Sequence, residues 1–191
     1  KKSLFIKSYG CQMNEYDSER MAEILEPFNY SPVNEPDQAD LIILNTCHIR
    51  EKAAEKIYSE LGRLKKINNK SNREPKIAVA GCVGQAEGQE IINRSPIVDL
   101  VFGPLTYHQL PEMLESIETK KGFPNKKLVN IEVPDIDKFN QLKGSRKSLR
   151  SISSLLSVQE GCDKFCSFCV VPYTRGVEIS RPANQILKEA V

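Results

Sequence analysis

The sequence LIILN at Leu41–Asn45, the helical pattern of Glu51–Ile67 and the sequence KIAVA at Lys76–Ala80 together decide the fold of this chain. The two short runs are almost entirely apolar, which is typical of strands buried on both faces of a parallel sheet. Between them, apolar residues such as Ile57 and Leu61 recur at helical spacing. A strand, a helix and a second strand in this order predict a right-handed parallel crossover.

The same alternation continues on both sides of this unit. Leu4–Ser8 and Val98–Phe102 are further strand candidates, and the helical patterns cover Tyr16–Leu25, Gly88–Asn93 and Tyr107–Ile117. Strands that alternate with helices in this way indicate an α/β domain with a parallel sheet. We therefore expect a flavodoxin-like or Rossmann-like domain over residues 1–118.

The pattern weakens after this domain. Residues 119–150 read as a connector with a possible strand at Leu128–Val133, and between Lys120 and Arg150 nine basic residues oppose three acidic ones. A net charge of +6 suits an RNA backbone, but a solvated linker explains it equally well. A second unit is expected over residues 151–191, with a strand at Ile152–Val158 and a helix at Pro182–Val191.

The composition is that of an ordinary globular protein. The chain has 191 residues, of which 40% are hydrophobic and 27% charged, and its net charge of +2 does not by itself indicate nucleic-acid binding. No stretch approaches the roughly 18 apolar residues of a membrane span, and the N-terminus does not resemble a signal peptide. We therefore expect a cytoplasmic protein without membrane contact. Six cysteines in such a protein favour metal ligands or catalytic thiols over disulfides.

Three of the cysteines follow predicted strands. Cys11, Cys47 and Cys82 are separated by 36 and 35 residues, about one strand–helix–strand unit each. The carboxyl ends of parallel strands share one edge of the sheet, so these thiols are expected to converge there. They could hold an iron–sulfur cluster and leave its fourth iron without a protein ligand. A single cysteine after a strand is more often a small buried apolar residue.

The residues around these cysteines have structural explanations. Asn14 or Asp17 is expected to cap the first helix, and Gly10 and Gly81 to permit tight turns between strand and helix. Asn45 or Thr46 is expected to cap the second helix. Asn45 could also orient a cluster ligand, and we expect the structural role.

The other three cysteines form a CxxxCxxC loop. Cys162, Cys166 and Cys169 lie within eight residues, so one loop can supply three corners of a cubane cluster. A structural zinc site takes four ligands, and the histidines, His48 and His108, are distant in sequence.

Four segments of the chain resemble the methylthiotransferase family of radical S-adenosylmethionine (radical-SAM) enzymes. They are YGCQMN at Tyr9–Asn14, NTCHIREKA at Asn45–Ala53, AGCVGQAEG at Ala80–Gly88 and SVQEGCDKFCSFCVVPYTRGVEISRP at Ser157–Pro182. The IREKA continuation favours the branch that modifies an isopentenylated adenosine in tRNA. It disfavours the branches that act on a ribosomal protein or on threonylcarbamoyl-adenosine.

The resemblance implies two [4Fe–4S] clusters and S-adenosylmethionine as cofactors. Cys162, Cys166 and Cys169 would ligate the cluster that binds S-adenosylmethionine, and Phe168 would contact that cofactor or pack beneath the loop. Cys11, Cys47 and Cys82 would hold an auxiliary cluster for sulfur delivery. The implied product is a methylthio group on C2 of N6-isopentenyladenosine beside the anticodon. The implied partners are a tRNA anticodon loop and a flavodoxin-like electron donor, with the enzyme as a monomer.

Other roles follow less directly from the matching segments. Tyr173, Arg175, Glu178 and Arg181 either order the cofactor or RNA or form salt bridges around the loop. The resemblance also implies a longer barrel than these residues supply. We therefore expect residues 151–191 to be the start of a TIM-like barrel, to pack poorly in isolation and to give little turnover.

Three alternatives remain open at this point. One is a non-catalytic iron–sulfur binding fragment, and a second is a zinc-binding RNA module that uses His48 or His108 as a fourth ligand. The third is a plain α/β domain with buried thiols.

Overall fold

The computed structural model describes residues 1–48, 51–71, 74–118, 127–133, 139 and 153–190. Six parallel strands form one sheet in the order β2-β1-β3-β4-β5-β6. Their bounds are β1 Lys2–Tyr9, β2 Tyr30–Pro32, β3 Leu41–Thr46, β4 Lys76–Ala80, β5 Leu100–Phe102 and β6 Leu128–Asn130. The four strands predicted with their helices are all present, and β6 forms within the candidate strand at Leu128–Val133.

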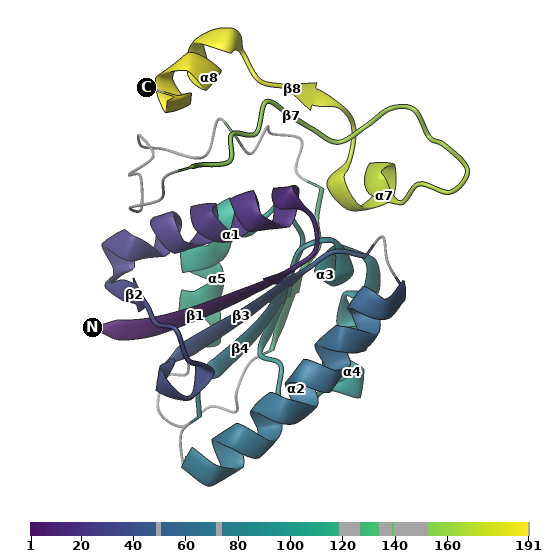
Figure 1. The fold of residues 1–191 in the computed structure, drawn as a ribbon. Coiled ribbons are helices and arrows are strands. Elements are labelled where there is room, and N and C mark those ends of the chain that lie inside the picture. Colours follow the sequence, from purple (N-terminus) through teal and green to yellow (C-terminus); the bar gives the residue numbers. More distant parts are fainter. Residues whose placement is uncertain (49–50, 72–73, 119–126, 134–138, 140–152, 191) are drawn as a thin grey trace.

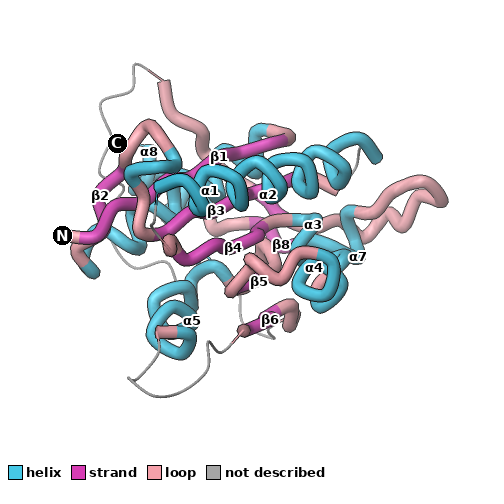
Figure 2. Tube along the Cα trace, turned by 90° about the horizontal axis from the view of Figure 1, so that it is seen from below, coloured by secondary structure: helices cyan, strands magenta, loops and turns pink. Residues whose placement is uncertain are grey.

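Helices cover both faces of the sheet (Figure 1). The α-helices of this part of the chain are α1 Gln12–Leu25, α2 Glu51–Ser71, α3 Cys82–Glu87, α4 Gln89–Arg94 and α5 Leu110–Ile117. Short 3-10 turns are η1 Glu26–Phe28, η2 Pro36–Gln38 and η3 Tyr107–Gln109. Figure 2, which views the molecule from below, shows the strands side by side, from β2 at one edge of the sheet to β6 at the other. None of the described helices is both long and apolar enough to cross a membrane.

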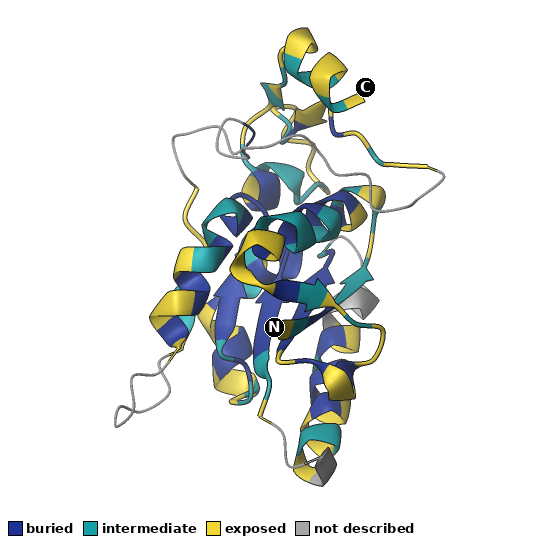
Figure 3. Ribbon diagram, turned by 90° about the vertical axis from the view of Figure 1, so that its left-hand side faces the viewer, coloured by how far each residue is buried: buried dark blue, intermediate teal, exposed yellow. Residues whose placement is uncertain are grey.

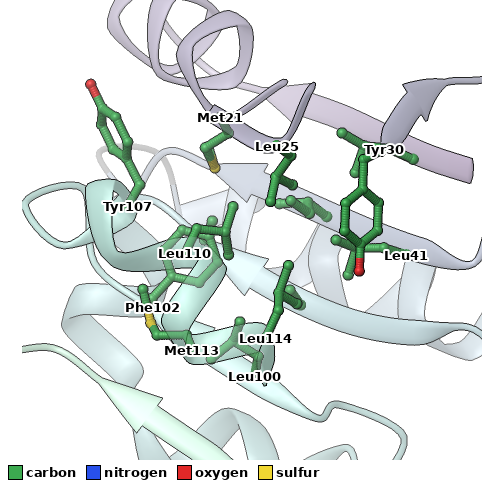
Figure 4. Packing of buried hydrophobic residues seen from close by; sticks show 14 of the residues in the cluster. Met21, Leu25, Tyr30, Leu41, Leu100, Phe102, Tyr107, Leu110, Met113 and Leu114 are labelled. Atoms are coloured by element: carbon green, nitrogen blue, oxygen red, sulfur yellow. The ribbon is translucent and has the colours of Figure 1, made fainter. Parts of the chain in front are cut away.

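The sheet is buried between two apolar layers (Figure 3). On one face, Met21 and Leu25 of α1 pack with Leu110 and Leu114 of α5 over the sheet, where they meet residues such as Phe102 (Figure 4). On the other face, residues of α2, α3 and α4 pack on the alternate positions of β3, β4 and β5. Every residue of β3 is buried, which explains the apolar run Leu41–Leu44 that begins it.

The strand order places a topological switch point between β1 and β3. The chain leaves β1 toward β2 on one side and returns to β3 on the other side of β1. In open α/β sheets of this order, ligands bind outside the carboxyl ends of the strands at the switch point. The fold therefore marks the edge that follows Tyr9 and Thr46 as the place for a functional site.

The C-terminal part of the chain lies beyond the carboxyl ends of these strands (Figure 1). It contains β7 Gln159–Glu160, α7 Val171–Arg175, β8 Ile179–Ser180 and α8 Ala183–Ala190, with β7 and β8 paired antiparallel. The strand predicted over Ile152–Val158 differs from the structure, since its described residues 153–158 are not in a strand and β7 begins only at Gln159. Apolar composition alone therefore does not place a segment in a strand.

Packing in this part is sparse, as expected. Among the described residues of 153–190 no hydrophobic side chain is buried, and the buried side chains there are polar: Ser157, Glu160, Thr174 and Arg175. The boundaries of the predicted domains remain a prediction.

Candidate metal centre

Three cysteines stand at the ends of three neighbouring strands. Cys11 lies two residues after β1 and directly before α1, Cys47 directly follows β3, and Cys82 begins α3 after β4. These strands are adjacent in the sheet, in the order β1-β3-β4. Cys47 and Cys82 are buried, Cys11 is half-buried, and all three are free thiols. The predicted convergence at one edge is therefore present, and we call this place the cysteine edge (Cys11, Cys47 and Cys82).

Two glycines allow the backbone to approach these cysteines closely. A Cβ at position 10 would lie 2.5 Å from the Cβ of Cys47. Gly81 has a φ of +85°, and a Cβ there would lie 2.3 Å from Oδ1 of Asn45. Such contacts are too short for any residue except glycine. The tight turns predicted at both positions are therefore confirmed, and glycine is required there for lack of space as well as for its backbone conformation.

A buried amide network fixes Cys11 and α1 against β3. The Asn14 side chain donates to Oδ1 of Asn45 at 3.0 Å, and the Asn45 amide donates to the Asn14 carbonyl at 2.7 Å and to Ser18 Oγ at 2.9 Å. The Cys11 thiol donates to Oδ1 of Asn14 at 3.2 Å. The expectation that Asn14 or Asp17 caps α1 is wrong, because the N-cap residue is Cys11 and no side chain caps the helix. The Asn14 amide instead donates to Asn45 of β3, and the Asp17 carboxylate accepts from Arg175.

The residues at the cysteine edge fit an iron–sulfur group. Ser8 Oγ, Thr46 Oγ1 and His48 Nδ1 are buried there without a hydrogen-bond partner among the described residues. Buried polar atoms of this kind point to a polar partner beyond the protein chain. The described residues hold no group of three Cys, His, Asp or Glu side chains arranged around a single ion. In a four-iron cluster each thiolate binds a different iron, so its ligands need not meet at one point.

The CxxxCxxC loop (residues 162–169) is shaped by its own backbone. The N–H of Cys162 donates to the Gly176 carbonyl at 3.2 Å, and the N–H of Cys169 donates to the Cys166 carbonyl at 2.9 Å. The chain turns at Phe165, which has a φ of +47°. Cys162 and Cys169 are half-buried and Cys166 is exposed. Three thiols are thus presented from one turn with an open side.

The aromatic residues of this loop lie open to solvent. Phe168 is 90% exposed. Phe165 packs edge-to-face on Tyr173, with ring centroids 6.3 Å apart, and both side chains are exposed. The packing of Phe168 beneath the loop is therefore absent, and its contact with S-adenosylmethionine stays a prediction.

A buried charge cluster connects the loop to the sheet domain. The Arg175 guanidinium donates from Nη2 to Oδ2 of Asp17 at 2.8 Å and from Nη1 to Oε1 of Glu160 at 2.7 Å. The three side chains are at most 5% exposed. Burial acts to lower the pKa of Arg175, but the charges of Asp17, Cys82 and Glu160 raise it well above its usual value. Arg175 is one of the predicted salt-bridge residues, whereas its partner Asp17 lies 158 positions away and has no sequence pattern that would predict the pairing.

The remaining candidate residues lie elsewhere. His48 follows Cys47 at the cysteine edge, whereas His108 lies in η3 beside Gln109. Of the nine basic residues between Lys120 and Arg150, only Lys127 is described, and its ammonium group donates to the Pro96 carbonyl. The predicted RNA contact of this stretch therefore falls outside the described residues.

Comparison with known proteins gives a consistent result. Residues 3–103 match the model of a family described as "Uncharacterized protein family UPF0004". The chain is 58% identical over 189 residues to a tRNA-2-methylthio-N(6)-dimethylallyladenosine synthase of Ruegeria sp. (strain TM1040), covering 99% of this chain and 42% of that protein. Proteins of the same name from Jannaschia sp. (strain CCS1) and Maricaulis maris (strain MCS10) are 57% and 56% identical, each over 99% of this chain.

The chain spans less than half the length of these relatives, and the alignments include both cysteine sets because they cover nearly all of it. The family model covers more than half of the chain and contains the whole cysteine edge. The chain therefore belongs to the UPF0004 family, as a homologue of the first two fifths of the tRNA-2-methylthio-N(6)-dimethylallyladenosine synthases.

Proposed function

We propose that this chain is the iron–sulfur binding portion of a radical-SAM tRNA methylthiotransferase. The observation that carries the proposal is the convergence of Cys11, Cys47 and Cys82 at the switch-point edge of the sheet. Thiolates are the preferred ligands of iron–sulfur clusters, and a three-thiolate site leaves one iron open for another ligand. In this proposal the cysteine edge holds an auxiliary [4Fe–4S] cluster that takes part in sulfur delivery.

The CxxxCxxC loop would hold a second [4Fe–4S] cluster through Cys162, Cys166 and Cys169. When bound, this cluster supplies the electron that cleaves S-adenosylmethionine reductively. The three cysteines would bind three irons and leave the fourth without a ligand from this loop, and the exposed Cys166 shows that the loop has an open side. Phe168 is proposed to contact S-adenosylmethionine, and its exposure leaves the ring accessible to a cofactor above the loop.

The substrate is proposed from the names of the relatives. These are synthases of a 2-methylthio-N6-dimethylallyl-adenosine in tRNA. We infer that the whole protein adds the methylthio group to C2 of N6-isopentenyladenosine next to the anticodon. A base in a single-stranded loop can enter a pocket without melting of a helix. An electron donor of the flavodoxin type completes the set of partners.

Anaerobic iron–sulfur reconstitution tests the two sites separately. The parent chain is compared with Cys11, Cys47, Cys82→Ala and with Cys162, Cys166, Cys169→Ala by iron and sulfide analysis. We expect about eight irons in the parent chain and about four in each triple variant. An electron paramagnetic resonance change on addition of S-adenosylmethionine should persist in the first variant and be lost in the second.

Other results would favour the alternatives. Stoichiometric zinc in place of iron favours a zinc-binding module, and iron–sulfur clusters that ignore S-adenosylmethionine favour a non-catalytic binding fragment. Mass spectrometry of tRNA and ribosomal proteins after reaction with the whole protein decides the substrate. A methylthio group on a different tRNA base, or on a ribosomal protein, would contradict the proposed substrate.

A further inference from the structure

The buried cluster of Arg175, Asp17 and Glu160 joins two segments that are far apart in sequence. Asp17 belongs to α1, six residues after Cys11. Glu160 ends β7, two residues before Cys162, and Arg175 ends α7, six residues after Cys169. The Arg175 guanidinium therefore ties both ends of the CxxxCxxC loop to the helix that begins at the cysteine edge.

Further contacts place the loop beside the same edge. Helix α7 packs against α3, whose first residue is Cys82. The carbonyl of Gly176, the residue after Arg175, accepts the N–H of Cys162. A Cβ at Gly176 would lie 3.4 Å from Leu105, so the backbone passes close to the sheet domain here. The charge cluster thus sits at the point where the two cysteine sets are joined.

We propose that Arg175 is a positioning residue that fixes the CxxxCxxC loop against the cysteine edge, with its positive charge at the end of the helix that packs on α3. The fixing of the loop rests on the contacts of the chain alone. The effect of the charge on a bound group rests on the proposed function. Arg175 touches no substrate in this proposal and acts through Asp17 and Glu160.

The chemistry of arginine suits this task. A guanidinium presents two N–H groups in a rigid fork, so it can bind two carboxylates from different segments at once. A lysine carries the same charge but lacks the fork. No described residue of 153–190 buries a hydrophobic side chain, so polar contacts hold this part in place. A second polar contact among the described residues joins Tyr16 to Glu189 of α8 and lies away from the CxxxCxxC loop in sequence.

Hydrogen exchange of the iron-free chain tests the fixing of the loop. The experiment compares the parent chain with three test variants, Arg175→Lys, Arg175→Gln and Asp17→Asn. The control is Arg63→Gln, which removes the partly exposed ion pair between Arg63 and Glu60 within α2. In all three test variants the amides of Cys162 and Arg181, which donate to Gly176 and Val158, should exchange at least about tenfold faster. The amides of β3 and β4 should keep their rates. Unchanged exchange at Cys162 and Arg181 in a folded Arg175→Gln chain would overturn the proposal.

The reduction potential tests the charge. In the Cys162, Cys166, Cys169→Ala background only the cluster of the cysteine edge remains. Arg175→Gln should shift its potential to a more negative value, because a nearby cation stabilises the reduced cluster. Arg175→Lys should retain most of the parent potential, and Glu189→Gln all of it.

A purely structural role would shift the potential equally in Arg175→Gln and Arg175→Lys, and this outcome contradicts the charge effect. If the chain binds no iron, the proposed function fails. The hydrogen-exchange result still decides whether Arg175 fixes the loop, because it needs no cluster.

Discussion

At the scale of single residues, the cysteine edge depends on positions where a side chain cannot be accommodated. Gly81 has a positive φ, and a Cβ there would meet the Asn45 amide and the Thr46 carbonyl. We expect Gly81→Ala to lower the free energy of unfolding by about 1–3 kcal/mol. The measurement is urea unfolding followed by circular dichroism.

Gly62 provides the matched control for this substitution. It lies in α2, and nothing lies within 4 Å of a Cβ built there. Gly62→Ala should therefore raise the free energy of unfolding by about 0.5–1 kcal/mol through helix propensity. Equal effects of the two substitutions would show that the close approach at Gly81 carries no energetic cost.

The residues of the candidate site differ in how well the sequence predicts them. Cys11, Cys47 and Cys82 are predictable because each follows a strand whose neighbours share an edge. Asp17, the partner of Arg175, cannot be predicted in this way, because a salt bridge between residues 158 positions apart leaves no local sequence pattern. Asn14 was misread as a helix cap, since its amide contacts Asn45 of a neighbouring strand, which only the tertiary structure reveals.

At the scale of elements, the sequence predicts best where burial is complete. The apolar run of β3 and the helical spacing of α2 are strong signals, because each reflects packing on a buried sheet face. β2 was missed because it is a three-residue edge strand that ends in Pro32. The run Ile152–Val158 has the composition of a strand, but its described residues lie outside the two-stranded sheet of β7 and β8. Pairing partners, unlike apolar composition, are not encoded locally.

The contact between α1 and α8 predicts a loss of stability at alkaline pH. Tyr16 is buried and its hydroxyl donates to Glu189 at 3.2 Å, and burial together with the charge of Glu189 raises its pKa to about 12. The pKa of an unfolded tyrosine is about 10. The native state therefore holds the phenol proton more tightly than the unfolded state. The contribution of Tyr16 to the free energy of unfolding is complete below pH ~10 and is lost as the pH rises toward ~12.

The effect can be measured by unfolding experiments between pH 9 and 12. The free energy of unfolding of the parent chain should fall by up to about 3 kcal/mol because of Tyr16. In Tyr16→Phe the free energy of unfolding should fall less steeply with pH, because this contribution is missing. Tyr107 and Tyr58 also have raised pKa values, so some slope remains in the variant. Tyr173→Phe is the control, because Tyr173 is exposed. An identical slope in Tyr16→Phe and the parent chain would refute the assignment to Tyr16.

At the scale of the whole molecule, two parts of the chain are held by different forces. The sheet domain has an apolar layer on each face, whereas the described residues of 153–190 contact it through polar side chains. Apolar burial is the dominant stabilising contribution to folding, and buried ion pairs contribute little net stability. The sheet domain should consequently fold without the C-terminal part.

A chain cut after Val133 tests this division. It keeps all six strands of the sheet and both apolar layers. It loses Arg175 and Glu160 together, and with them the segment that covers Asp17. Asp17 then becomes exposed to water, so the cut leaves no unpaired buried charge. We expect cooperative urea unfolding with a midpoint close to that of the sheet domain in the full chain.

The same chain should bind about four irons on reconstitution, the number expected for one four-iron cluster. Cys47→Ala in the shortened chain is the control and should abolish most of this iron. A strongly lowered midpoint would mean that residues 134–190 contribute to the core. Retained stability without iron would mean that the cysteine edge needs the C-terminal part to bind a cluster. The second outcome would make the contacts around Arg175, which link the two parts, the first candidates for that requirement.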